Sequence, residues 1–98
     1  MRKRLSFARQ ATTDLDEVWD YSEEEWGREQ ADRYTTEIAR RCDDLLEGKI
    51  VPQDIKVKRG RFLRIRSGSH FIFLRDTPDE LRVVRVLHVR RNIKKALG

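Results

Sequence analysis

Cysteine and proline are scarce in this chain of 98 residues, and it has no long apolar run. Cys42 is the only cysteine, so no internal disulfide can form, which favours a reducing compartment such as the cytoplasm. The basic start Met1-Arg2-Lys3-Arg4 resembles that of a signal peptide, but charged and polar residues between positions 9 and 14 interrupt the apolar segment that should follow. No stretch approaches the length of a membrane-spanning helix. We therefore expect a soluble, cytoplasmic protein with no membrane partner.

Common signatures of catalysis and of metal binding are also missing. Gly60 and Gly68 are isolated and do not have the spacing of a phosphate-binding loop. One cysteine and two distant histidines, His70 and His88, do not make a zinc site. Nothing in the spacing supports a Ser/His/Asp triad. We expect neither a metal nor a cofactor.

Acidic residues are absent from positions 56–75 and again after Glu80, whereas they crowd positions 14–32. Charged residues make up 40% of the chain, and its formal net charge is +5. A basic second half beside an acidic first half indicates an anionic partner, or one that masks the basic face. The alternative is a basic surface that serves only solubility.

Two amphipathic helices are predicted in the first half, at Thr13–Glu25 and Glu29–Glu47. Gly27 separates them, and Thr12 or Thr13 is the expected cap of the first. Two helices with so short a break should fold back as an antiparallel hairpin. Apolar or small side chains recur at helical spacing and form one stripe on each helix: Ala11, Leu15, Val18, Trp19, Ser22 and Trp26, then Ala31, Tyr34, Ile38, Cys42 and Leu45.

Strands are predicted at 5–8, 62–66, 70–76 and 81–89, and turn residues separate the last three. The last strand should be central, because apolar residues lie on both of its faces: Leu81, Val83, Leu87 and Val89 on one, Val84 and Val86 on the other. Pro52 and several charges make 50–59 an expected exposed connection, and 93–97 could form a closing helical turn. The prediction is an α+β fold in a single domain, 1–98: an N-terminal strand, an antiparallel two-helix hairpin, then a three-strand antiparallel meander that completes one sheet.

Arginine and histidine side chains on the predicted sheet are the candidates for function. Arginines on a sheet face can hold phosphates with two hydrogen bonds, and the alternative is a solvated face that protects sheet edges. His88 could act as a general acid or base because its pKa lies near neutrality, although a lone histidine at a strand end is more often structural. The set comprises Arg61, Arg64, Arg66, His70, Arg75, Arg82, Arg85, His88, Arg90 and Arg91.

Four segments, in order, carry a resemblance to the ParE toxins of the RelE/ParE superfamily. Residues 11–21 (ATTDLDEVWDY) resemble that family's first helix, and 26–34 (WGREQADRY) resemble the start of its second. Residues 62–74 (FLRIRSGSHFIFL) resemble its central hairpin, and 83–91 (VVRVLHVRR) its final strand and basic end. The connection 48–60 departs from the family's usual Pro-rich, Gly-Arg form.

The resemblance implies the toxin of a type II toxin–antitoxin pair. Members of the ParE branch poison DNA gyrase and so block replication. A ParD-like antitoxin wraps the toxin with its C-terminal segment and binds operator DNA through its own N-terminal domain, so the toxin is expected in a hetero-oligomer and to reach operator DNA only through the antitoxin. We expect Arg90, Arg91 and His88 to contact the target. The expected antitoxin contacts are Trp26, Tyr34, Phe62, Arg64 and Ile65.

The RelE branch offers an alternative, ribosome-dependent cleavage of mRNA. That chemistry needs a base, an acid and cations for the phosphate, which here would be His88 with Arg64, Arg66 and Arg90. Both tyrosines lie on predicted helices, so only His88 and His70 remain on the sheet to move protons near neutral pH. The sequence therefore favours a toxin that inhibits gyrase by binding. A third reading is a basic binding module that has no toxicity.

Overall fold

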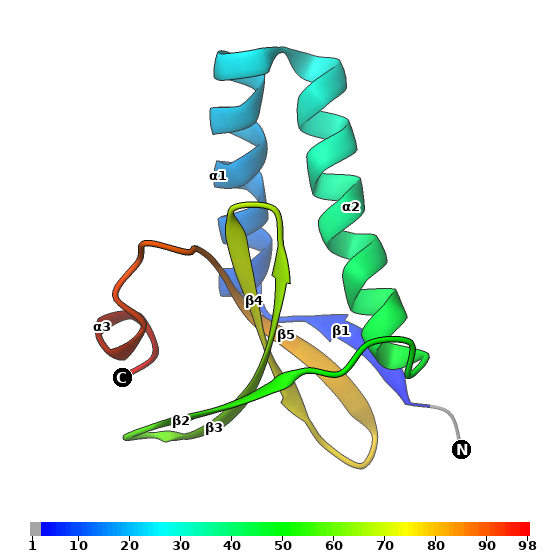
Figure 1. Ribbon diagram of the computed structural model, residues 1–98, viewed down its shortest axis with the longest axis vertical. Coiled ribbons are helices and arrows are strands. Elements are labelled where there is room, and N and C mark those ends of the chain that lie inside the picture. Colours follow the sequence, from blue (N-terminus) through cyan, green and yellow to red (C-terminus); the bar gives the residue numbers. More distant parts are fainter. Residues whose placement is uncertain (1–2) are drawn as a thin grey trace.

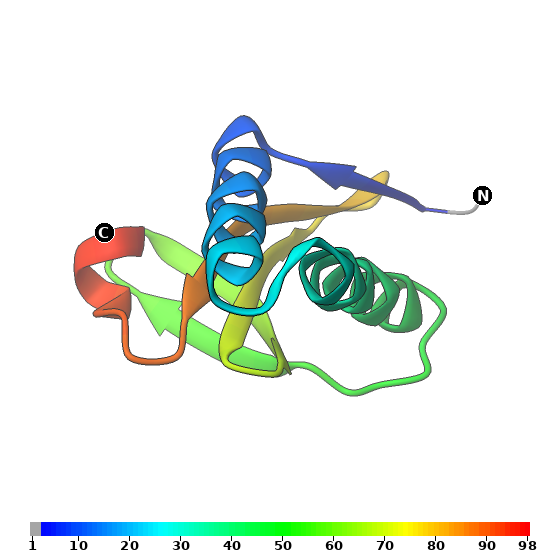
Figure 2. The same ribbon diagram turned by 90° about the horizontal axis from the view of Figure 1, so that it is seen from above.

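The computed structural model describes residues 3–98 and contains a mixed sheet with a long helical hairpin on one face (Figure 1). A short C-terminal helix lies on the side of the molecule away from the second hairpin helix (Figure 2). No helix in the described part of the chain is both long and apolar enough to cross a membrane. The elements are β1 (Arg4–Phe7), α1 (Arg9–Trp26), α2 (Arg28–Leu46), β2 (Gln53–Val57), β3 (Gly60–Ser67), β4 (His70–Asp76), β5 (Glu80–His88) and α3 (Ile93–Leu97).

The hairpin forms as predicted, but α1 begins at Arg9 and not at Thr13. Ala8 stands at the N-cap and makes no side-chain cap hydrogen bond. The helix begins early because the chain is already fixed to the sheet: the Ala8 amide donates to the Val83 carbonyl at 2.8 Å, and Ala11 in the first turn is fully buried. Tertiary packing thus overrides the capping signal at Thr12 and Thr13. Gly27, with φ of 92°, separates the helices.

The strand order is β1-β5-β4-β3-β2, with β1 parallel to β5 and every other pair antiparallel. The inner position predicted for the last strand is confirmed. The exposed connection predicted for 50–59 is wrong, because residues Gln53–Val57 form β2 and pair with β3. Pro52 precedes this strand, and β2 lies at the sheet edge, where a neighbouring proline removes no ladder hydrogen bond.

A β-bulge in β5 changes which side chains face the hairpin. Phe73 pairs with Arg85 and Leu74 pairs with Val83, so Val84 is the extra residue. The bulge shifts the alternation by one position. Leu81, Val83 and Val86 therefore join the cluster under the hairpin, whereas Val84 and Leu87 join the cluster on the other face. The predicted grouping of Leu87 with Leu81 was wrong for this reason.

The core has one apolar cluster on each face of the sheet. The larger cluster joins both hairpin helices to β3, β4 and β5, and it includes fully buried Ile38 and Cys42. Burial raises the pKa of the Cys42 thiol to about 12, with a smaller contribution from Asp43. The smaller cluster packs Phe62, Phe73 and Leu87 under Leu97 of α3. Trp19 of α1 also contacts the second helix, since its indole N–H donates to Asp32 Oδ1 at 2.8 Å.

Candidate functional site

A groove lies between α1 and the ends of β4 and β5, and we call it the β5 groove. Its volume is about 180 Å³. It brings together carboxylates from the acidic helix with histidines and an arginine from the basic end of the sheet. Its lining residues are Asp14, Glu17, Val18, Tyr21, His70, Val86, Leu87, His88 and Arg91.

A polar cluster of Tyr34, His70 and His88 lies at the edge of this groove. The Tyr34 hydroxyl lies 2.7 Å from His70 Nδ1 and accepts a hydrogen bond from the Ser69 amide at 2.9 Å. His70 and His88 are paired across β4 and β5, and their ring centroids are 5.4 Å apart. The tyrosine hydroxyl thus reaches the β3–β4 turn from α2. The sequence did not predict this contact, because Tyr34 lies on a helix and the pattern does not show that its hydroxyl extends to the sheet.

The two histidines differ in environment. Burial, with a smaller effect from the nearby His88, lowers the pKa of His70 below its usual value, so His70 is neutral near pH 7. His88 is exposed, and its Nδ1 accepts a hydrogen bond from the Arg90 amide at 3.1 Å. A neutral His88 that accepts at Nδ1 carries its proton on Nε2. The backbone after β5 therefore sets the tautomer of this ring.

An ion pair attaches α1 to the sheet beside the groove. Asp14 has 5% of its side chain exposed and Arg85 has 17%, and Arg85 Nε lies 2.8 Å from Asp14 Oδ2. Asp14 Oδ2 also accepts from the Val86 amide at 2.9 Å. A buried carboxylate with several donors is a fixed part of the framework, so Asp14 positions the groove wall and is not free to bind a ligand.

Arginines stacked on aromatic rings characterise the sheet face opposite the hairpin, which we call the basic face. The Arg64 guanidinium carbon lies 4.0 Å from the centroid of Phe71, and that of Arg75 lies 4.6 Å from the centroid of Phe62. Arg64 also donates twice to Gln53 Oε1, at 2.9 and 2.8 Å. Stacking and hydrogen bonding hold these cations in place, which reduces the entropy lost when they bind an anion.

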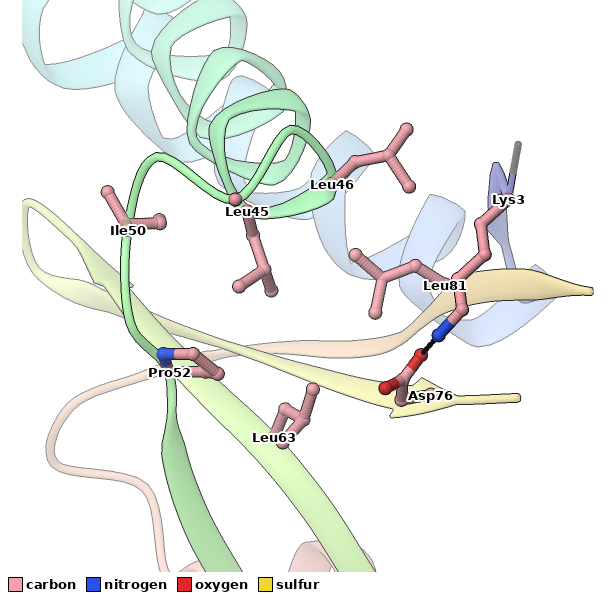
Figure 3. A pocket seen from close by; sticks show the side chains of 9 residues that line it. Lys3, Leu45, Leu46, Ile50, Pro52, Leu63, Asp76 and Leu81 are labelled. Atoms are coloured by element: carbon pink, nitrogen blue, oxygen red, sulfur yellow. Dashed lines mark hydrogen bonds and ion pairs between the residues drawn. The ribbon is translucent and has the colours of Figure 1, made fainter. Parts of the chain in front are cut away.

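An apolar pocket of about 270 Å³ lies where α2 meets the sheet (Figure 3). Leu45, Leu46 and Ile50 enter it from the end of α2 and the loop that follows. Lys3 forms an ion pair with Asp76 at its rim. Apart from this ion pair, the described residues that line the pocket contain no group suited to acid–base chemistry.

The predicted target residues lie together after β5. His88 and Arg91 line the β5 groove, and Arg90 is exposed beside them. The residues of the nuclease alternative are divided. His88 faces the groove beside α1, and Arg90 is exposed close to it. Arg64 and Arg66 instead stack over Phe71, which packs with the cluster on the opposite face.

The predicted antitoxin residues also lie on different parts of the molecule. Trp26 is exposed at the end of α1, and Tyr34 is engaged with His70. Ile65 is buried under the hairpin, whereas Phe62 is buried on the opposite face, where Arg64 also lies. These five residues do not share one surface. No group of three or more potential metal ligands occurs within residues 3–98.

Comparison with known proteins agrees with this architecture. The family model described as "ParE toxin of type II toxin-antitoxin system, parDE" matches residues 5–93. The chain belongs to the ParE toxin family.

Two relatives in this family match the chain over nearly its whole length. It is 35% identical to Toxin ParE1 of Caulobacter vibrioides over 96 residues, which cover 98% of this chain and 99% of the relative. It is 30% identical to Toxin ParE1 of Mycobacterium tuberculosis over 98 residues, or 99% of this chain and 100% of that one. The ParE fold is seen again in a chain of the chromosomal ParDE TA system from P. aeruginosa, with a TM-score of 0.76 and 21% identity over 91% of this chain and 98% of that chain.

Proposed function

We propose that this ParE toxin acts in the cytoplasm by binding DNA gyrase and stopping replication, without chemistry of its own. The observation that carries the proposal is the division of the ionisable groups between the two sheet faces. Of the residues that the nuclease alternative requires, His88 lines the groove beside α1 and Arg90 follows it closely in the chain, whereas Arg64 and Arg66 lie on the basic face. A nuclease needs its proton-transfer groups and its phosphate-binding cations around one reacting phosphate. This arrangement supports inhibition by binding.

The target surface in this proposal is the segment after β5. Arg90 and Arg91 are exposed and follow His88, and none of the three forms an ion pair with another residue of the described chain, 3–98. Free guanidinium groups can make charge-assisted hydrogen bonds to a partner carboxylate. The segment thus offers several strong contacts within a few residues.

Neutralisation in this proposal comes from a ParD-like antitoxin that binds the toxin directly. The basic face, with Arg64, Arg66 and Arg75 over its aromatic rings, is suited to an acidic, amphipathic tail. Such a tail would be disordered until it binds, which allows it to cover a wide surface. Operator DNA is then bound by the antitoxin domain of a hetero-oligomer and not by the toxin itself.

One expression experiment tests the proposal against its alternatives. The toxin is induced alone and with the product of the adjacent gene, while DNA breaks and mRNA ends are mapped in parallel. We expect growth arrest with gyrase-linked DNA breaks and no new mRNA ends, and rescue by the co-expressed partner. Ribosome-dependent mRNA cleavage without DNA breaks would show that the toxin is a nuclease and not a gyrase inhibitor. Normal growth without the antitoxin would leave only a non-toxic binding module.

A further inference from the structure

Two aromatic side chains near the tip of the hairpin are exposed and contact each other. Tyr21 is 59% exposed and Trp26 is 64% exposed, and their rings meet edge to face with centroids 6.1 Å apart. They lie on the last turns of α1, at the end of the hairpin that extends beyond the sheet (Figure 1). Neither belongs to either core cluster of the described chain. Burial in this fold therefore does not explain why large aromatic residues occupy these positions.

The carboxylates around the aromatic pair destabilise helix α1. Asp16, Asp20 and Glu24 repeat at a spacing of four residues, which sets like charges next to one another. The last turn of α1 contains no basic residue, although carboxylates near a helix C-terminus oppose the helix dipole. Six carboxylates of α1 are exposed and form no ion pair within residues 3–98: Asp16, Glu17, Asp20, Glu23, Glu24 and Glu25.

This acidic aromatic surface is continuous with the surface after β5. Tyr21 and Glu17 line the β5 groove together with His88 and Arg91. The groove thus links the aromatic pair to residues that already belong to the proposed target surface. A partner bound to the segment after β5 could therefore also contact Tyr21, and Trp26 lies directly beside Tyr21.

We propose that Tyr21, Trp26 and the surrounding carboxylates form a docking site for a basic protein surface that presents arginine or lysine side chains. The inference rests on the proposed function and assigns that basic surface to gyrase. Arginine side chains stack on tryptophan and tyrosine rings, and the carboxylates steer a positively charged partner toward them. Aromatic residues at the centre of an interface often carry most of its affinity. The sequence led us to expect Trp26 among the antitoxin contacts. The carboxylates around it would repel an acidic antitoxin tail, so this proposal assigns Trp26 to the gyrase surface instead.

The test measures the affinity of purified toxin variants for purified gyrase and for the antitoxin. Tyr21→Ser/Trp26→Ser removes the aromatic pair, and its control is Val51→Ser, which alters a 93% exposed side chain beside the apolar pocket at the other end of the hairpin. Glu24→Lys reverses one charge near the end of α1. Its control is Asp43→Lys, an exposed carboxylate near the end of α2. Lysine is favourable near a helix C-terminus, so both charge variants should fold.

We expect Tyr21→Ser/Trp26→Ser to weaken gyrase binding by about tenfold or more, with antitoxin affinity unchanged and Val51→Ser equal to wild type. Glu24→Lys should weaken gyrase binding most at low salt, and Asp43→Lys should not. Unchanged gyrase affinity in the aromatic variant, or a loss confined to antitoxin binding, would overturn the inference while leaving the proposed function intact. Wild-type self-association that the aromatic variant abolishes would assign the pair to a second copy of this chain. Failure of wild type to bind gyrase would refute the proposed function itself and the docking site with it.

Discussion

Asp14 and Arg85 are 71 positions apart, and the Arg85 guanidinium donates to both carboxylate oxygens of Asp14, at 2.8 and 3.2 Å. Arg85 Nη1 also donates to the Ala96 carbonyl at 3.4 Å, so one side chain joins α1, β5 and α3. Strand β1 pairs with β5 only as far as Val83, and beyond it the Val86 amide donates to Asp14. The helix thus supplies the acceptor that a neighbouring strand would otherwise provide.

Asp14→Ala should lower the free energy of unfolding by about 3–5 kcal/mol, because it leaves Arg85 largely buried without its counter-ion. Arg85→Met should also be costly, since it leaves the Asp14 side chain, which is only 5% exposed, without its ion-pair partner. The double variant Asp14→Ala/Arg85→Met should lose less stability than the two single losses added together. A loss of about 1–3 kcal/mol should remain, because the buried Val86 amide no longer has its acceptor on Asp14. Urea unfolding of all three proteins measures these values. Simple additivity would show that the pair is not coupled.

Gly68→Ala should displace Tyr34 from the β3–β4 turn. Gly68 has φ of +57°, and an added Cβ would lie 2.7 Å from Tyr34 Cε1. Gly48→Ala is a matched control, because Gly48 also has a positive φ, of +76°, but no atom within 4 Å of the added Cβ. Backbone strain alone costs about 1–2 kcal/mol, so Gly68→Ala should lose more than Gly48→Ala in thermal unfolding. In a Tyr34→Ala background the two costs should become equal, and a persistent difference would contradict the steric explanation.

Local patterns predicted the hairpin, its break at Gly27 and the inner position of β5, since helical spacing and turn residues are encoded within a few positions. The features that were missed depend on distant partners. Residues 53–57 become a strand only through pairing with β3, and the bulge at Val84 is defined by β4 across the sheet. For the same reason, sequence spacing placed His88 and Arg91 together in the candidate site but did not bring Tyr34 to His70, 36 positions away.

The stability of the fold should fall as the pH drops below about 6.5, the ordinary pKa of histidine. Burial lowers the pKa of His70 in the folded state, and the neighbouring His88 adds to the effect. Below the unfolded pKa, the unfolded chain binds the proton more readily than the folded chain does. The contribution of His70 to stability is therefore fully present above pH 6.5 and is lost as the pH falls through the lower pKa that His70 has in the folded state. The other titratable groups that line the β5 groove are Asp14, Glu17, Tyr21, His88 and Arg91.

His70→Asn tests this linkage, because an asparagine amide can replace Nδ1 beside Tyr34 without titrating near neutrality. Thermal unfolding between pH 7.5 and 5 should show a steeper decline in Tm for wild type than for the variant. Parallel declines would mean that carboxylates, and not His70, cause the acid sensitivity.

Arg90→Ala/Arg91→Ala should weaken toxicity more than His88→Ala, with the fold intact in all variants. In a toxin that acts by binding, the arginine pair contributes several charge-assisted contacts, whereas His88 contributes one exposed side chain at the end of β5. A general acid or base would behave differently, since its removal should lower a reaction rate by about two to four orders of magnitude. Growth after induction without antitoxin gives the ranking. Arg59→Ala/Arg61→Ala is the matched control, because it removes the same charge from two exposed arginines, one in the β2–β3 turn and one in β3. The opposite ranking, with mRNA cut in phase with codons, would make His88 the catalytic group of a nuclease.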